Sequence, residues 1–261
     1  MYLKKHYEEK QGLTPVIEKN GSSLKMLELD MLVLKAGKKT TVSEKAKDFA
    51  LVVLSGTCSV SGAGFSYTNV GARKSVFDGP AATVFIPMDT AFTVTAETDV
   101  KIAVCKSPAQ KKFKPALVSS GEVVIKHLGK NGWKREAHFN LDDRVDANLL
   151  YIGEAFAEGG MWASYPPHKH DEDNMPAEGI LEEYYYYEFD KPAGFGIQKV
   201  YTKDGAIDET YTVTTGDVVE IPKGYHPYAC APGYRGYYLW VMAGKNRGFF
   251  MTTDEKHKWL C

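Results

Sequence analysis

The stretch "GDVVEIPKGYHPY", residues 216–228, decides the fold because its first part has the composition of a β-strand. The run from Asp217 to Ile221 is rich in β-branched residues, and Pro222 and Gly224 then predict a tight turn. His226 stands just beyond this turn. Because a rigid turn aims an imidazole in one direction, this position suits a metal ligand.

The same pattern occurs a second time, in the N-terminal half of the chain. The segment "ATVFIPMDTAF", residues 82–92, aligns with residues 217–227, and both contain Ile-Pro at the same place. Ala91 then takes the position of His226. We interpret this internal repeat as two copies of one β-barrel, of which the first lacks the histidine.

The rest of the chain also predicts an all-β fold. Short runs of β-branched and aromatic residues alternate with turns of Gly, Pro, Asp and Ser on both sides of a polar, basic stretch, residues 106–143. Such regular spacing is typical of a sandwich or barrel. We predict an N-terminal barrel over residues 1–110, a connector over 111–145 and a C-terminal barrel over 146–261.

Composition excludes several classes of protein. The chain has 261 residues and a formal net charge of −1, so no overall field attracts nucleic acid or an anionic membrane. No run approaches the roughly 20 apolar residues of a membrane span, and the first residues do not form a signal peptide. The four cysteines are far apart and form no CxxC pair, so neither a disulfide framework nor a thiolate zinc site is expected. A reduced, cytoplasmic protein is predicted.

The clearest candidate for chemistry is the segment "SYPPHKH", residues 164–170. In a strand, His168 and His170 point to the same face with their Cα atoms roughly 6.5–7 Å apart, while Lys169 points to the other face. Two imidazoles on one inward face can share a metal ion. The acidic residues that follow, 171–173, are interpreted as a solvated loop.

The next strand offers a carboxylate, and side-chain alternation favours Glu183 over Glu182. If Glu183 faces the interior, Phe189 does so too and Glu188 lies in water, whereas the opposite register buries Glu188. We therefore expect Glu183 as the third ligand, with Glu182 as the alternative, and His226 as the fourth. Three histidines and one carboxylate suit Zn²⁺ or Mn²⁺ before Fe²⁺ or Ni²⁺.

This combination of motifs resembles the cupin superfamily. His168 and His170 match its HxH motif, and its second motif is matched by Gly216, Pro222, Gly224 and His226. One departure is the 12 residues between His170 and Glu183, where cupins have only a few. Longer segments, "LEEYYYYEF", "GFGIQKVYT" and "GARKSVFDGP", look like those of the 5-deoxy-glucuronate isomerases of myo-inositol catabolism.

The resemblance implies a bicupin, two double-stranded β-helix (jelly-roll) barrels with metal ligands only in the second. It also implies a metal-dependent aldose–ketose isomerase that converts 5-deoxy-glucuronate to 5-dehydro-2-deoxy-gluconate. Three alternatives stay open: the related uronate ketol-isomerase of pectin breakdown, a cupin dioxygenase, and a non-catalytic sugar-acid binder. A homo-oligomer formed through edge strands is possible by analogy.

The resemblance also directs attention to residues that could contact a sugar acid. Tyr185 shares the face of Glu183, and Gln198 lies on the next strand, so both are expected to bind substrate. A uronate needs a cationic partner as well, for which the candidates are Lys199, Arg235 and Arg247. No residue is assigned as the acid or base that moves the proton.

Overall fold

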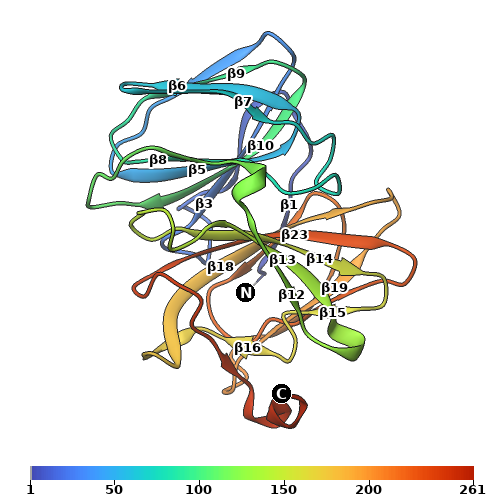
Figure 1. The fold of residues 1–261 in the computed structure, drawn as a ribbon. Helices are drawn as coiled ribbons and strands as arrows, with labels where there is room; N and C mark the ends of the chain where they lie inside the picture. The colour runs from blue at the N-terminus through green and yellow to red at the C-terminus, as the bar shows by residue number, and fades with distance from the viewer. Residues whose placement is uncertain (1) are drawn as a thin grey trace.

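The protein is described by a computed structural model that covers residues 2–261 and consists almost entirely of β-strands. Figure 1 shows two barrels, the N-terminal one (blue to green) above the C-terminal one (yellow to red). This confirms the predicted all-β fold with two barrels in one chain. In the described residues, no helix is long and apolar enough to cross a membrane.

The first barrel is built from a six-stranded and a four-stranded sheet. The six-stranded sheet contains, in spatial order, β11 (Ala116–Val118), β8 (Thr83–Ile86), β5 (Lys47–Ser55), β10 (Val100–Pro108), β3 (Glu28–Leu34) and β2 (Gly12–Ile17). The four-stranded sheet contains β4 (Lys39–Val42), β9 (Phe92–Ala96), β6 (Thr57–Gly62) and β7 (Phe65–Gly71).

The second barrel is built around an eight-stranded sheet. Its order is β1 (Lys4–His6), β21 (Asp217–Ile221), β18 (Glu178–Phe189), β23 (Arg235–Gly244), β14 (Tyr151–Glu158), β13 (Arg135–Leu141) and β12 (Val124–Leu128), with β17 (Asp171–Asn174) also paired to β18. Facing it are β15 (Trp162–Ala163), β22 (Tyr228–Cys230), β19 (Gly196–Tyr201) and β20 (Asp208–Val213). A two-stranded sheet of β16 (His168–Lys169) and β24 (Thr252–Thr253) and three short 3₁₀ helices, η1 (Ser120–Glu122), η2 (Asn131–Trp133) and η3 (Glu255–Leu260), complete the described chain.

Strand alternation divides the apolar residues among three cores. In β5, Leu51 and Val53 point into the first barrel, while Ala50 and Val52 point into a layer between the two large sheets. The interior of the second barrel forms the third core. Both faces of the large sheets are therefore buried, which explains why their strands are apolar at nearly every position.

The tyrosine run of β18 follows the same rule. The odd-numbered tyrosines point into the second barrel and the even-numbered ones into the layer between the barrels: Tyr185 and Tyr187 inward, Tyr184 and Tyr186 outward. The expectation that Glu188 lies in water is wrong. Its carboxylate is half-buried and accepts a hydrogen bond from Lys101 Nζ at 2.9 Å, because the outer face of this sheet is covered by the other barrel.

The segments outside the two repeats also contribute strands. Within residues 111–145, β11 extends the large sheet of the first barrel, whereas β12 and β13 extend that of the second. At the other end of the chain, β1 pairs with β21 and so belongs to the sheet of the second barrel. The boundaries 1–110, 111–145 and 146–261 stay a prediction. The pairings show that strands from the first two segments also join the large sheet of the second barrel.

A buried ion pair joins the two barrels. Arg73, which follows β7, donates a hydrogen bond at 2.6 Å from Nη2 to Glu154 Oε1 in β14, and both side chains are almost fully buried. Tyr237 Oη donates to the same oxygen at 2.8 Å, and Asn140 Nδ2 donates to Oε2 at 3.2 Å. The remaining guanidinium donors of Arg73 bind backbone carbonyls of its own barrel. A charge pair this well hydrogen-bonded fixes how the barrels dock.

Candidate metal centre

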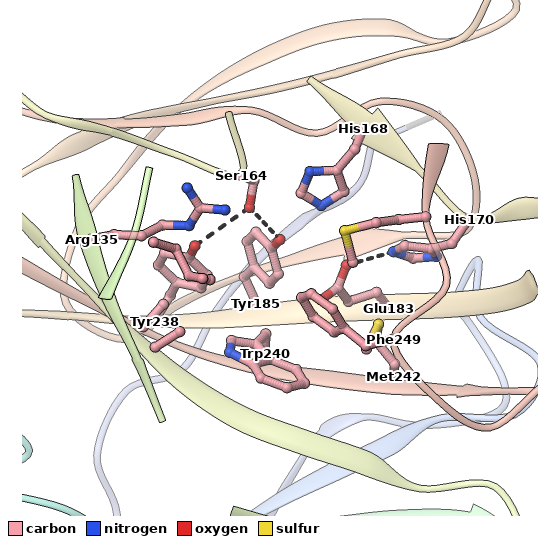
Figure 2. A pocket seen from close by; sticks show the side chains of 14 residues that line it. Arg135, Ser164, His168, His170, Glu183, Tyr185, Tyr238, Trp240, Met242 and Phe249 are labelled. Carbon is pink, nitrogen blue, oxygen red and sulfur yellow. Dashed lines mark hydrogen bonds and ion pairs between the residues drawn. The ribbon is translucent and has the colours of Figure 1, made fainter. Parts of the chain in front are cut away.

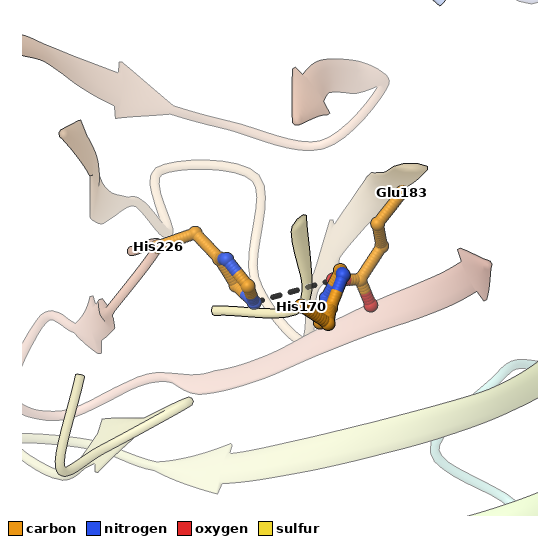
Figure 3. Close-up of side chains that lie close together, drawn as sticks. All are labelled: His170, Glu183 and His226. Carbon is orange, nitrogen blue, oxygen red and sulfur yellow. Dashed lines mark hydrogen bonds and ion pairs between the residues drawn. The ribbon is translucent and has the colours of Figure 1, made fainter. Parts of the chain in front are cut away.

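The candidate site lies inside the second barrel, where three separated segments meet. His170 follows β16, Glu183 lies on β18, and His226 lies in the turn between β21 and β22. One potential ligand atom from each residue lies within 4.8 Å of the other two, and all three side chains are buried (Figure 3). Two imidazoles and a carboxylate at this spacing could hold a metal ion.

Backbone carbonyls fix how the two rings present their nitrogens. His170 Nδ1 lies 2.9 Å from the carbonyl oxygen of Leu181, and His226 Nδ1 lies 2.9 Å from that of Gly224. A carbonyl oxygen only accepts hydrogen bonds, so each Nδ1 carries the hydrogen and each Nε2 is left to face the cluster. Metal-binding histidines in proteins are oriented by the same kind of contact.

The two Nε2 atoms converge on one carboxylate oxygen. His170 Nε2 is 3.0 Å and His226 Nε2 is 3.2 Å from Glu183 Oε2. In addition, His226 Nε2 is buried and has no hydrogen-bond partner. Buried lone pairs and a negative charge at such distances repel one another unless a cation lies among them, so the donor set fits a divalent ion.

The pKa values of His170 and His226 also indicate that a positive charge would stabilise the cluster. Burial lowers the pKa of His226 to about 4, although the charge of Glu183 acts in the opposite direction. Burial alone would lower the pKa of His170 too, but its hydrogen bond and charge interaction with Glu183 raise it above the ordinary value. A proton on His170 is therefore one way to supply the missing charge, and a metal ion is the other.

His168, the first histidine of the HxH pair, lies beside the cluster rather than within it. Its ring centroid is 4.9 Å from that of His226, but it is not a member of the group of three. Figure 2 shows its ring on the same side of the cavity as His170. Burial and the neighbouring histidines lower the pKa of His168 well below its ordinary value, so its ring stays neutral and able to bind a metal.

Lys169 points away from the cavity, as alternation predicts, but it is buried. Its Nζ lies 2.6–2.8 Å from carboxylate oxygens of Asp171, Glu172 and Glu178. The interpretation of residues 171–173 as a solvated loop is wrong in two respects, because they belong to strand β17 and Asp171 is half-buried, whereas Glu172 and Asp173 are exposed as expected. Asp171 also accepts a hydrogen bond from Gly224 N at 2.8 Å, so this ion cluster connects the HxH segment to the turn that carries His226.

The two adjacent glutamates of β18 have separate roles. Glu183 points to the two histidines, and Glu182 points to the opposite face. There the Glu182 carboxylate accepts hydrogen bonds from Lys25 N at 2.9 Å and Met26 N at 2.5 Å. Glu182 thus anchors the loop before β3, and Glu183 alone of the pair faces the cavity.

The cavity beside the cluster is lined by polar and aromatic side chains (Figure 2). Ser164 Oγ lies 2.7 Å from Tyr185 Oη and 3.4 Å from Tyr238 Oη, which gives one wall a row of three hydroxyl groups. Burial, reinforced by the charge of Glu183, raises the pKa of Tyr185 well above its ordinary value. Tyr185 therefore remains a neutral phenol, which can donate or accept a hydrogen bond.

Comparisons with known proteins identify the relatives of this chain. A family model described as the KduI/IolB family matches residues 2–260.

The chain belongs to the KduI/IolB family.

Among its relatives, a 5-deoxy-glucuronate isomerase of Bacillus subtilis is 40% identical over 243 residues, which cover 92% of this chain and 90% of that protein. One from Shouchella clausii is 40% identical over 255 residues, 96% of this chain and 94% of that protein. The crystal structure of an IolB-like protein from Salmonella typhimurium is 37% identical, covers 100% of this chain and 99% of that one, and has a TM-score of 0.95. An oxalate decarboxylase of Lactobacillus farciminis, at 11% identity, covers 98% of this chain and 89% of its own, with a TM-score of 0.70. At that identity the likeness concerns the cupin fold alone.

In this KduI/IolB member, the two predicted substrate contacts occupy different environments. Tyr185 lines the cavity, whereas Gln198 does not. Gln198 is fully buried, its Oε1 accepts from Tyr187 Oη at 2.7 Å, and its Nε2 donates to the carbonyls of His226 and Pro227 at 2.8 and 3.2 Å. Contact between Gln198 and the substrate stays a prediction. These hydrogen bonds do not favour it, because they already occupy the side-chain amide. The contacts instead make it a residue that positions the His226 turn.

We expect Gln198→Leu to weaken metal binding about 10-fold, the lower end of the effect of removing groups that orient metal ligands. The leucine leaves the His226 carbonyl without its side-chain donor, whereas the Pro227 carbonyl keeps its bond from Lys199 N, so the turn loses the contact that fixes its direction at His226. Competition with a chelator of known affinity measures the change. Gln110→Leu, at an exposed position, is the matched control. Unchanged metal affinity in a folded Gln198→Leu protein would contradict the positioning role.

The cationic candidates from the sequence are engaged outside the cavity. Lys199 pairs with Asp208 at 2.6 Å and Arg235 with Glu158 at 3.3 Å, while Arg247 binds two backbone carbonyls. The cavity is lined by another cation, Arg135, at the start of β13.

Sequence reasoning missed Arg135 because its segment was assigned to the connector. The signal is present in the alternation of "REAHF", in which Ala137 and Phe139 point into the second barrel and Arg135 shares their parity.

Proposed function

We propose that this protein is a metal-dependent aldose–ketose isomerase that converts 5-deoxy-glucuronate to 5-dehydro-2-deoxy-gluconate in myo-inositol catabolism. The observation that carries the proposal is the convergence of His170, Glu183 and His226 inside the second barrel. The support for the substrate is the 40% identity, over 92% of the chain, to a protein named 5-deoxy-glucuronate isomerase.

The metal would be held by His170, Glu183 and His226, with His168 as the fourth ligand. Zn²⁺ or Mn²⁺ fits this set of nitrogen and oxygen donors first, and Fe²⁺ or Ni²⁺ second. When bound, a divalent ion supplies Lewis-acid stabilisation of the negative charge that develops on two neighbouring substrate oxygens. The backbone carbonyls of Leu181 and Gly224 keep the imidazole rings aimed before the ion arrives.

The remaining cavity residues bind and shield the substrate. Isomerisation moves hydrogen from C2 to C1 of the aldose, oxidises C2 and reduces C1, and therefore needs no external oxidant. Tyr185, Tyr238 and Ser164 present hydroxyl groups that can hydrogen-bond to the sugar hydroxyls. Trp240 and Phe249 close the apolar side of the cavity, which limits access of water to the reacting carbons.

We expect the purified protein to isomerise 5-deoxy-glucuronate without oxygen, and to lose this activity when a chelator removes its metal. Re-addition of the divalent ion found by elemental analysis should restore the rate, because the ligands remain in place. The measurement is anaerobic turnover followed by NMR of substrate and product. A dioxygenase would need O₂, and a pure sugar-acid binder would give no turnover, so either result would overturn the proposal.

The uronate ketol-isomerase of pectin breakdown is tested in the same assay. If 4-deoxy-hexosulose-uronate is converted with a higher kcat/KM than 5-deoxy-glucuronate, the substrate assignment is wrong although the reaction class stands. Metal content of His168→Ala measures the fourth ligand separately. Equal metal affinity in that variant and in the wild type would remove His168 from the ligand set.

A further inference from the structure

Arg135 occupies one end of the cavity, opposite the metal-ligand cluster. It is the first residue of β13, and it lines the cavity together with His170 and Glu183. Figure 2 shows its guanidinium and Tyr238 at one side of the view and these two ligands at the other, with Tyr185 in between. The cavity therefore has a cationic end, a hydroxyl-lined middle and a metal-binding end.

The guanidinium of Arg135 is left free to bind a ligand. Within residues 2–261 it forms no ion pair, and its one hydrogen bond runs from Nη1 to the carbonyl oxygen of Tyr165 at 3.3 Å. By contrast, Arg73, which is buried between the barrels, binds Glu154 and several carbonyls. Arg135 is half-buried, and none of its nitrogens is among the buried polar atoms that lack a partner, so its unused donors are open to a ligand in the cavity.

Arg135 also lies where the cavity meets the protein surface. It lines a second, outer groove together with Lys134, Glu136 and Arg235, and Leu128 borders both hollows. The other charged side chains of this groove are of both signs, and Arg235 is paired with Glu158. A ligand that enters through the groove would meet Arg135 before it reaches the histidines.

We propose that Arg135 binds the carboxylate of the sugar acid and makes the site select an acid over a neutral sugar of the same length. The inference rests on the proposed function. In 5-deoxy-glucuronate the carboxylate is at the far end of the chain from the C1 and C2 atoms that react. A planar guanidinium can donate two parallel hydrogen bonds to a carboxylate, which fixes the substrate's direction in the cavity.

The alternative role for Arg135 is structural, since its bond to Tyr165 could hold the segment that leads to His168. The two roles predict different effects on different substrates. Loss of a carboxylate partner weakens binding of the uronate only, and acts mainly on KM because the carboxylate is remote from the chemistry. Loss of a structural tie lowers turnover of charged and neutral substrates alike.

The experiment compares Arg135→Met with wild type on two substrates, 5-deoxy-glucuronate and the neutral 5-deoxy-glucose. We expect KM for the uronate to rise roughly 100-fold, the effect of losing a charge-assisted hydrogen-bonded pair, with kcat changed only a few-fold. Activity on 5-deoxy-glucose should stay the same. Arg135→Lys, which keeps the charge but not the fork of donors, should give an intermediate KM.

Arg235→Met is the matched control, because it removes an arginine that lines the same groove but is paired with Glu158. The KM and kcat of this variant should stay within about two-fold of the wild-type values on both substrates. A rise in KM for the uronate as large as that of Arg135→Met would indicate a general attraction of anions by the groove and would overturn the inference. An equal loss on both sugars in Arg135→Met would overturn it as well.

Calorimetric binding of the uronate separates this inference from the proposed function. If wild type binds 5-deoxy-glucuronate but does not convert it, the isomerase function fails. In that case the role of Arg135 is supported if Arg135→Met no longer binds the uronate, and it is refuted if the variant binds the uronate as wild type does. If wild type converts the uronate and the variant binds it equally well, only the role of Arg135 fails. Absence of binding to wild type would overturn both.

Discussion

Glu183→Gln is expected to lose the bound divalent ion and to lower kcat roughly 10³-fold, as removal of a principal electrostatic stabiliser does. The substitution keeps size and shape but replaces the negative oxygen that lies 3.0 and 3.2 Å from the two histidine Nε2 atoms. A neutral amide supplies much less attraction for a cation. Elemental analysis of the purified variant and steady-state turnover of 5-deoxy-glucuronate measure the two effects.

Glu182→Gln, one residue earlier, is the control that this chain offers. Its carboxylate faces the other side of the sheet and accepts hydrogen bonds from the backbone of Lys25 and Met26. We expect that variant to keep its metal and its kcat, and to lose about 1 kcal/mol of unfolding free energy through the weaker hydrogen bonds. Metal loss in Glu182→Gln with retention in Glu183→Gln would invert the assignment and refute the site described here.

Arg73→Met is expected to lower the free energy of unfolding by about 3–5 kcal/mol, because it leaves the Glu154 carboxylate buried without its partner. Glu154 is fully buried in the layer between the barrels, where water cannot replace the lost charge. The midpoint of urea unfolding measures the change. Lys35→Met, which breaks an exposed pair with Asp99, should leave that midpoint unchanged.

The ion pair between Arg73 and Glu154 also makes the free energy of unfolding depend on pH, in a direction that follows from the pKa of Glu154. Burial by itself would raise the pKa of Glu154, but Arg73 and the surrounding donors lower it to about 2. A carboxyl group with a lowered folded-state pKa stabilises the protein above its unfolded value, roughly 4.3, and this stabilisation is lost as the pH falls toward 2. The difference in unfolding free energy between wild type and Arg73→Met should therefore shrink below about pH 4. A constant difference from pH 7 to pH 3 would contradict this role of Glu154.

The sequence allowed the fold and much of the site to be predicted because both depend on alternation along strands. The repeat of an Ile-Pro turn indicated two barrels, and the parity of β18 predicted that Glu183 faces the interior. Both rest on local rules that a β-strand obeys wherever it lies. The turn after β21 likewise carries His226 toward the cluster, since its shape is determined by Pro222 and Gly224.

The parts that were missed depend on contacts between distant segments. Glu188 was expected in water because nothing in β18 indicates that a second barrel covers its outer face. Gln198 was expected at the substrate, but the backbone of the His226 turn uses its amide. Arg135 was overlooked because its strand joins the sheet from outside the repeat. In each case tertiary packing, which a single strand pattern does not contain, decides the role of the side chain.

The pairing of β1 with β21 bears on the order in which the molecule is assembled. Lys4 and Asp217, which form an ion pair at this seam, are 213 residues apart, so during synthesis β1 cannot pair until β21 has left the ribosome. The barrel that carries the candidate ligands therefore closes this edge late, with a segment made more than 200 residues earlier. Any peptide fused ahead of Lys4 would emerge beside that seam, and a C-terminal purification tag is the safer choice for the metal measurements above.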